Sequence, residues 1–322
     1  MLNLSIDLHL HFDGSLSLDT VKRLAQMQGV ALPENEKIIE MLTVGNNCSN
    51  LAQYLEKFEF PLSLLQNEGA IEEGMYLLCK ELVAENCIYA EIRFAPQLHT
   101  RNGLTQDSVA AAAIRGFERS KLLGGLILCC MRGNDNKEQN LITVEIANKY
   151  LGSGVLAIDL AGNEAAFPTG DFEEIFAKAR RFSIPFTVHA GEADGAESVK
   201  KAIELGAARI GHGVRSLEDE EVVMTLANKK IPLELCPTSN LNTAIFSNIN
   251  QYPIRRLMNK GVIVTVNSDN RSVSDTTALR DMNIVKKAFG LSDEAEKQML
   301  INAVNSAFCT DEVKQKLLEV IG

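Results

Sequence analysis

A strand-like segment near the N-terminus carries two histidines at a spacing that suits a metal ion. From Asp7 to Gly14 the sequence reads Asp-Leu-His-Leu-His-Phe-Asp-Gly. Alternate side chains of a strand share a face, so Asp7, His9 and His11 would point one way and the leucines the other. Two imidazoles on one face can bind the same ion. A half-buried strand with a solvated polar face would show the same alternation, so further ligands are needed to decide.

Three more side chains of suitable type follow β-rich runs later in the chain. They are His189 and His212, each after a short apolar run, and Asp269 in Asn-Ser-Asp-Asn. His9, His11, His189 and Asp269 together would supply the three nitrogens and one oxygen that zinc accepts, with an open position for water. The pKa of that water would fall to ~7. The sequence therefore predicts one metal ion per subunit, zinc or a similar ion, and the same donor set also suits iron, cobalt or manganese.

Two residues suit acid–base roles beside this water. Glu192 follows His189 by three residues, and burial would raise the pKa of its carboxyl so that it acts as an acid at neutral pH. His212 would orient the water or shuttle its proton. Structural explanations exist for each residue alone: a core histidine for His212, the first turn of a helix for Glu192, and a cap for Asp269. Such explanations do not account for the whole set.

The elements that must position these residues alternate between short β-rich runs and amphipathic helical segments. Seven β-rich runs follow the opening strand, at 87–96, 125–132, 155–162, 185–190, 209–214, 232–236 and 262–267. Eight strands alternating with helices predict an α/β fold, a closed (β/α)₈ TIM barrel whose active site lies where the strands end. A doubly wound open sheet also alternates, but no GxGxxG motif follows the first strand.

Two regions exceed what a barrel needs. Residues from about 15 to 86 predict a helical insertion after the first strand, with Ser17 and Ser49 as helix caps and Pro61 as a stop. After Thr276 the sequence again predicts mostly helix, more than one closing helix requires. Since no linker, repeat or low-complexity tract divides the chain, residues 1–322 are expected to form a single domain.

Composition narrows the class of partner. The net charge of -10 argues against nucleic acid or an anionic membrane as a partner. No apolar run approaches the ~20 residues that span a bilayer, and the N-terminus lacks the pattern of a signal peptide. The seven cysteines include no CxxC pair, which indicates reduced thiols and a cytoplasmic protein.

Six short motifs, in order over nearly the whole chain, resemble the adenosine deaminases of the metal-dependent barrel hydrolase superfamily. They are HLHFDG at 9–14, DLAG at 159–162, HAGE at 189–192, GHG at 211–213, CPTSN at 236–240 and NSD at 267–269. Each motif alone is weak, whereas the ordered set is specific. The resemblance implies zinc-dependent hydrolysis of adenosine to inosine and ammonia, and the same reaction of 2′-deoxyadenosine, in purine salvage, with a small-molecule nucleoside as the partner.

The resemblance also implies a role for individual residues. Glu192 matches the acid that protonates purine N1, and His212 matches the residue that assists the attack of zinc-activated water on C6. Gly162 matches a backbone N–H donor to N3, and Asp13 matches a residue near the ribose 5′-hydroxyl. The metal ligands His11 and Asp269 are expected to contact the substrate and to take part in catalysis, respectively.

One position departs from the common family pattern. Many members continue the metal aspartate as Asp-Asp-Pro, whereas this chain reads Asp269-Asn270-Arg271. The resemblance implies that Asn270 faces N7, and an amide donates there at any pH. This feature resembles the bacterial adenosine deaminases and favours a nucleoside substrate. Alternatives are a sister deaminase acting on adenine or on a modified adenosine such as aminodeoxyfutalosine, and a catalytically inactive barrel that only binds a nucleoside.

Overall fold

Eight parallel strands form a closed ring in the computed structural model, which describes residues 2–45, 48 and 50–322. Two four-stranded sheets, β1-β2-β3-β4 and β5-β6-β7-β8, are joined by bridges between Leu10 and Asp269 and between Ile158 and Phe186. The strands in the described residues are β1 Ser5–His11, β2 Cys87–Phe94, β3 Gly124–Met131, β4 Val155–Ala161, β5 Thr187–Ala190, β6 Arg209–His212, β7 Leu233–Leu235 and β8 Val264–Val266. The predicted (β/α)₈ barrel is confirmed.

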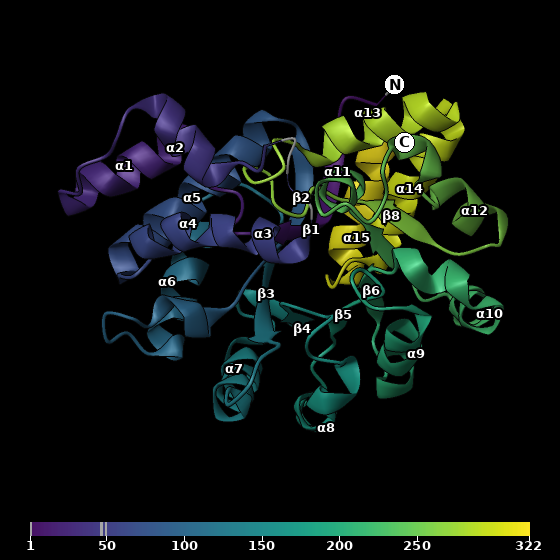
Figure 1. Ribbon diagram of the computed structural model, residues 1–322, viewed down its shortest axis with the longest axis horizontal. Coiled ribbons are helices and arrows are strands. Elements are labelled where there is room, and N and C mark those ends of the chain that lie inside the picture. Colours follow the sequence, from purple (N-terminus) through teal and green to yellow (C-terminus); the bar gives the residue numbers. More distant parts are fainter. Residues whose placement is uncertain (1, 46–47, 49) are drawn as a thin grey trace.

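Helices surround this ring (Figure 1). Those between successive strands from β2 to β8 include α6 Gln106–Glu118, α7 Lys137–Tyr150, α8 Glu173–Arg181, α9 Ala196–Leu205, α10 Glu220–Lys229, α11 Pro237–Asn242 and α12 Ile254–Asn259. In α8 the acidic residues occupy the first turn and the basic residues the last, which complements the helix dipole. The strands are Val-, Ile- and Leu-rich because helices cover them outside and side chains fill the ring inside.

The predicted helical insertion lies between β1 and β2. Its α-helices in the described residues are α1 Leu18–Gln28, α2 Asn35–Leu42, α3 Leu51–Leu55, α4 Glu59–Leu64 and α5 Glu68–Ala84. Ser17 caps α1 as predicted. Ser49 lies outside the described residues, and Asn50 caps α3. The expectation that Pro61 stops a helix is wrong: Pro61 lies in the first turn of α4, where a missing N–H breaks no helical hydrogen bond.

Three helices follow the last strand, namely α13 Ala278–Phe289, α14 Asp293–Ser306 and α15 Asp311–Ile321. Side chains of α14 and α15 pack against Ile6, Leu8 and Tyr89 in a hydrophobic cluster outside β1 and β2. The C-terminal helices therefore support the strand that carries the first two histidines. Among the described residues, no helix combines the length and apolar character needed to cross a membrane.

Candidate metal and active site

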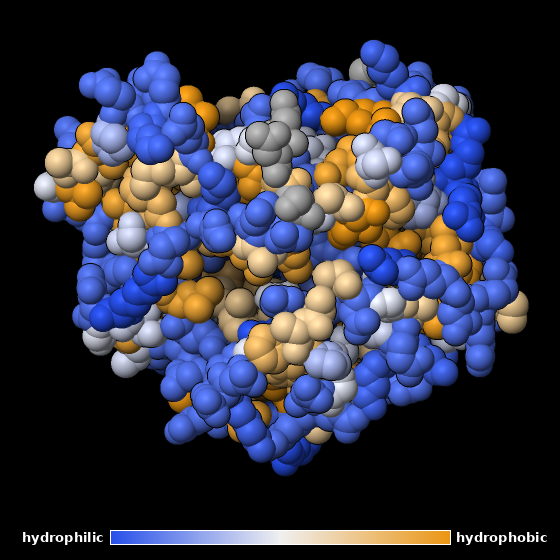
Figure 2. Space-filling model, viewed as in Figure 1, coloured by the Kyte–Doolittle hydropathy of each residue, from blue (hydrophilic) through white to orange (hydrophobic). Residues whose placement is uncertain are grey.

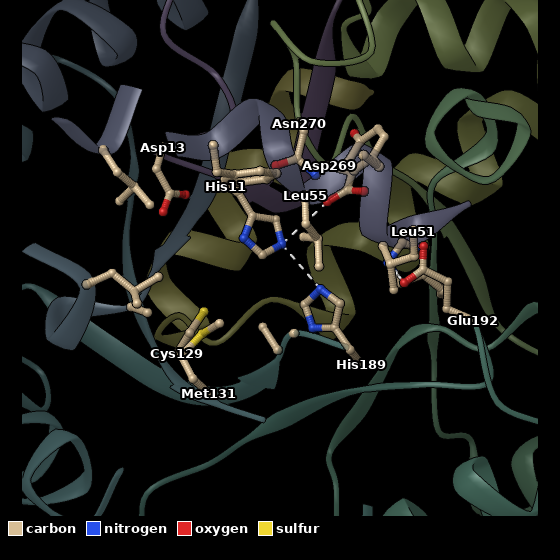
Figure 3. A pocket seen from close by; sticks show the side chains of 18 residues that line it. His11, Asp13, Leu51, Leu55, Cys129, Met131, His189, Glu192, Asp269 and Asn270 are labelled. Atoms are coloured by element: carbon tan, nitrogen blue, oxygen red, sulfur yellow. Dashed lines mark hydrogen bonds and ion pairs between the residues drawn. The ribbon is translucent and has the colours of Figure 1, made fainter. Parts of the chain in front are cut away.

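Four side chains predicted to bind metal converge at the carboxyl end of the barrel. His9 and His11 come from β1, His189 from β5, and Asp269 from the segment after β8; one ligand atom from each lies within 4.8 Å of the others. Nε2 of His11 is 3.2 Å from Nε2 of His189 and 3.4 Å from Oδ1 of Asp269, as Figure 3 shows. The backbone hydrogen bonds from His11 N to Asp269 O (2.7 Å) and from Asp269 N to His9 O (2.8 Å) hold these two segments together.

The donor set fits a divalent cation such as zinc. Nδ1 of His9 is 2.8 Å from Oε2 of Glu234, and Nδ1 of His189 is 2.9 Å from Oδ2 of Asp159. Each Nδ1 lies beside a carboxylate, which leaves the Nε2 atoms to face the centre. Nε2 of His9 is buried and has no hydrogen-bond partner among the described residues. Burial also lowers the pKa values of His11 and His189, which leaves neutral imidazoles to coordinate the ion.

A network of buried charges lies beneath the histidines, inside the barrel. The Arg93 guanidinium is 3.0 Å from Asp159 and 2.9 Å from Glu234, the two carboxylates that contact the histidines. Arg209 pairs with Glu234 and with Glu91. Sequence reasoning missed Glu234 and Arg209 as supports of the site. The available signal was a charged residue inside a run that otherwise reads as a buried apolar strand, as in Leu-Glu-Leu of β7.

Glu192 and His212 face each other beside the four convergent side chains. His212 Nε2 lies 3.6 Å from Glu192 Oε2, and the two residues are 1% and 5% exposed. Burial and the charges of Asp269 and Glu164 raise the pKa of Glu192 well above its usual value. Burial, reinforced by the nearby His9, lowers the pKa of His212 well below its usual value. These shifts favour the protonated form of the carboxyl and the neutral form of the imidazole.

Glu164 fixes the loop that carries Glu192, and sequence reasoning missed it. Its carboxylate accepts hydrogen bonds from four consecutive backbone N–H groups, those of residues 191–194, at 2.6 to 3.0 Å. The Ser198 hydroxyl adds a fifth at 2.5 Å. The acceptor is a buried anion that gathers the unpaired donors of a tight turn. From sequence, Glu164 was only an acidic residue in a loop after β4.

The remaining predicted site residues line one pocket with this centre. His11, Asp13, Gly162 and Asn270 lie on its walls with Glu192 and His212. In Figure 3, Asp13 and Glu192 stand on opposite sides of the histidines. Burial raises the pKa of Asp13 to about 7. Gly162 has a φ of 109°, which favours glycine at this point of the wall.

The outer wall of the pocket is apolar and comes from the insertion. Leu51 and Leu55 of α3, Phe58 and Leu62 line the pocket, together with Met131 and Leu98 from outside the insertion. Figure 2 shows apolar surface around a hollow near the centre of this face. Among the described residues that line the pocket, none is lysine or arginine. The pocket thus combines an apolar wall with a polar end and suits a neutral, flat ligand.

Three residues without a predicted role have structural contacts. Asp7 accepts hydrogen bonds from the backbone N–H of His9 (3.2 Å) and from the Ser268 hydroxyl, and so ties β1 to the segment after β8. His99 is fully buried with Nδ1 2.9 Å from the Leu65 carbonyl oxygen. Arg271 bonds to a glutamate at the end of α5. These contacts tie the insertion to the barrel and to the segment after β8, and that segment to β1.

Comparison with known proteins agrees with this geometry. The sequence profile of a family described as adenosine deaminase matches residues 5–322. This chain belongs to the adenosine deaminase family. It is 43% identical to an adenosine deaminase of Haemophilus ducreyi, over 97% of this chain and 94% of that relative. The chain is therefore a hydrolytic deaminase, as the resemblance implied.

Solved structures of similar proteins have the same fold. An adenine deaminase from Arthrobacter aurescens superposes with a TM-score of 0.89 at 24% identity, covering 99% of this chain and 98% of that chain. An amidohydrolase from Burkholderia ambifaria, solved with bound zinc, gives a TM-score of 0.87 at 20% identity, over 99% of this chain and 89% of that chain. At these identities the likeness concerns the barrel and not the substrate.

Replacement of a carboxylate behind a histidine should weaken metal binding. In Asp159→Asn the neutral amide polarises His189 less and leaves Arg93 with one fewer counter-charge. We expect zinc affinity to fall by about 10- to 100-fold, measured by competition with a fluorescent zinc chelator. Asp171→Asn, an exposed carboxylate beyond the same strand, is the control and should bind zinc as the wild type does. Equal affinity of the two variants would contradict the role of Asp159.

Proposed function

We propose that this protein hydrolyses adenosine to inosine and ammonia, using one zinc ion per subunit held by His9, His11, His189 and Asp269. The observation that carries the proposal is a buried carboxyl with a raised pKa, Glu192, in one pocket with a donor set that suits zinc. The names of the full-length relatives support adenosine as the substrate. The zinc-bound amidohydrolase of the same fold supports the choice of metal.

The chemistry follows from the protonation states of the pocket. When bound, zinc lowers the pKa of a water molecule and so makes a nucleophile at neutral pH. Glu192 gives its proton to N1 of the purine, which draws electrons from C6 and prepares that carbon for the water oxygen. His212 orients the nucleophile. The bond from C6 to the amine then breaks and a C6 carbonyl remains. One proton of the water leaves with ammonia, and the other restores the Glu192 carboxyl.

Asp269 stays ionised throughout this sequence. Although burial opposes ionisation, the imidazole of His9, whose Nε2 is 3.4 Å from Oδ1 of Asp269, holds the pKa of Asp269 below its usual range. An anionic carboxylate beside the nucleophile accepts a hydrogen bond from it and fixes its direction. Two carboxyl groups in one pocket thus take opposite roles, one as an acid and one as an anion, because their surroundings differ.

The remaining wall residues are assigned to the nucleoside. Gly162 donates its backbone N–H to N3, the Asn270 amide donates to N7, and Asp13 contacts the 5′-hydroxyl, while His11 contacts the substrate beside C6. Their common position on the walls of one pocket supports these assignments. The lining of Leu and Phe side chains suits the faces of a purine.

The cellular setting is part of the same proposal. We assign the reaction to purine salvage in the cytoplasm, and we treat residues 1–322 as a single catalytic domain. All seven cysteines are free and five of them are buried, as in proteins kept in a reducing compartment. The proposed substrate is a small nucleoside, including 2′-deoxyadenosine, rather than a nucleic acid.

Metal removal tests the proposed reaction directly. Deamination of adenosine lowers its ultraviolet absorbance, so turnover can be followed without coupling enzymes. We expect activity to disappear after chelation and to return with zinc, because no side chain of the pocket replaces the metal-activated water. The same assay with adenine, 2′-deoxyadenosine and aminodeoxyfutalosine separates the sister activities. No turnover of any of these compounds by the zinc-loaded protein would contradict the proposal and favour an inactive barrel.

Loss of the acid should separate catalysis from metal binding. Glu192→Gln keeps the shape of the side chain but has no proton to give to N1, so we expect kcat to fall by about 10²- to 10⁴-fold with zinc content unchanged. In the wild type, kcat should fall as pH rises through the raised pKa of Glu192, since only the protonated form is active. Turnover by Glu192→Gln at the wild-type rate would show that another group is the acid.

The pocket should reject a 5′-phosphate. Asp13 stands where the 5′-hydroxyl is assigned, and the described lining contains no lysine or arginine to pair with a phosphate. Above the raised pKa of Asp13, where its carboxylate is charged, a like-charge contact of this kind costs several kcal/mol, so we expect kcat/KM for AMP to be about 1,000-fold below that for adenosine there. The matched control is 5′-deoxyadenosine, which lacks the hydroxyl without adding charge and should lose much less. Comparable turnover of AMP and adenosine would contradict the assignment of Asp13.

A further inference from the structure

Asn240 lies between the two groups to which the proposed reaction assigns acid and orienting roles. It sits in α11, directly after β7, and its side chain is fully buried. The amide nitrogen Nδ2 is 3.2 Å from Nδ1 of His212 and 3.5 Å from Oε1 of Glu192. The hydroxyl of Tyr252, itself buried, donates to Oδ1 of Asn240 at 3.1 Å. Both ends of the amide therefore have partners.

The direction of this amide decides which ring nitrogen of His212 carries a proton. With Oδ1 occupied by the Tyr252 hydroxyl, the NH₂ group faces His212, and an amide nitrogen only donates. Nδ1 of His212 must then accept, so it is unprotonated. A neutral imidazole carries one proton, which must lie on Nε2. The cation, with a proton on both ring nitrogens, could not accept from the amide, so the ring is neutral.

This tautomer decides whether Nε2 of His212 can donate or accept a proton. Nε2 is the nitrogen directed toward Glu192, at 3.6 Å. In the tautomer set by Asn240 this nitrogen donates a hydrogen bond and has no lone pair with which to take a proton. Orienting the nucleophile and shuttling its proton, which the sequence left as alternatives for His212, thus require opposite tautomers.

We propose that Asn240, held by Tyr252, is a positioning residue that fixes His212 as the Nε2–H tautomer, so that His212 donates to the attacking oxygen and does not act as its base. The proposal rests on the proposed deaminase reaction for its catalytic meaning. The tautomer itself exists without substrate, and it can therefore be measured whether or not adenosine is the substrate.

Nitrogen NMR on the full-length protein labelled with ¹⁵N-histidine measures this tautomer. Protonated and unprotonated ring nitrogens differ widely in ¹⁵N shift, and loss of one set of signals in His212→Gln assigns the residue among five histidines. We expect protonated Nε2 and unprotonated Nδ1 at neutral pH, in both zinc-loaded and zinc-free protein. A proton on Nδ1 of wild-type His212 would overturn the proposal, and this result requires no other variant.

An isosteric variant reverses the hydrogen bond. In Asn240→Asp the carboxylate can only accept, so the proton of His212 should move to Nδ1. Asn242→Asp makes the same change two residues further along α11 and should leave the His212 spectrum as in the wild type. Tyr252→Phe releases the amide and should give a mixture of the two tautomers. An unchanged His212 spectrum in Asn240→Asp, with the fold intact by circular dichroism, would also overturn the proposal.

Kinetics then connect the tautomer to the reaction. We expect Asn240→Asp to lower kcat by about 100-fold, as for loss of one oriented donor at the reacting atoms, with KM for adenosine changed much less. Asn242→Asp should keep both parameters. If the wild type does not deaminate adenosine, the proposed function fails while the spectra still test the tautomer. If Asn240→Asp shifts the proton but keeps the wild-type kcat, His212 does not act as a donor in the reaction.

Discussion

The structure depends on one buried cation inside the barrel, the guanidinium of Arg93. It lies between Asp159 and Glu234, and each of these carboxylates also contacts a histidine of the metal centre. Removing one partner of such a buried pair leaves an uncompensated charge and costs about 3–5 kcal/mol. β2, β4 and β7 are therefore held in one relative position, because only there do the charges meet. Because the same carboxylates contact His9 and His189, the positions of these two imidazoles are restricted as well.

Neighbouring charges also set the pKa values of the two carboxyl groups above this network. Glu192 and Asp269 are both buried carboxyl groups, yet the pKa of one is raised and that of the other lowered. Burial and the charges of Asp269 and Glu164 act on Glu192, whereas contacts with the imidazoles of His9, His11 and His212 outweigh burial at Asp269. His212 and Asp269 both adopt positive φ angles, of 59° and 61°, and such backbone is retained where surrounding contacts hold it. Rigid support thus sets both position and protonation.

Much of this organisation was readable from sequence, because it depends on local patterns. Strand and helix periodicity gave the barrel, and the rule that barrel active sites lie at strand ends placed His9, His189 and Asp269 together. The supporting residues could not be read in this way. Glu164 acts through backbone N–H groups whose direction depends on a turn, and Asn240 acts through an amide whose orientation depends on Tyr252. Pro61 was misread because a proline stops or starts a helix according to where the helix begins.

The bridge between Leu10 and Asp269, which closes the ring, joins the first strand to the segment after the last one. During synthesis the first two histidines therefore exist long before their carboxylate partner, and the barrel has no closed rim to hold an ion. Arg209 also donates a hydrogen bond to the Ser306 carbonyl oxygen, so the contacts of the buried charges are complete only after α14 has been synthesised. A nascent chain on the ribosome consequently lacks the complete set of candidate ligands until the two ends of the polypeptide have met.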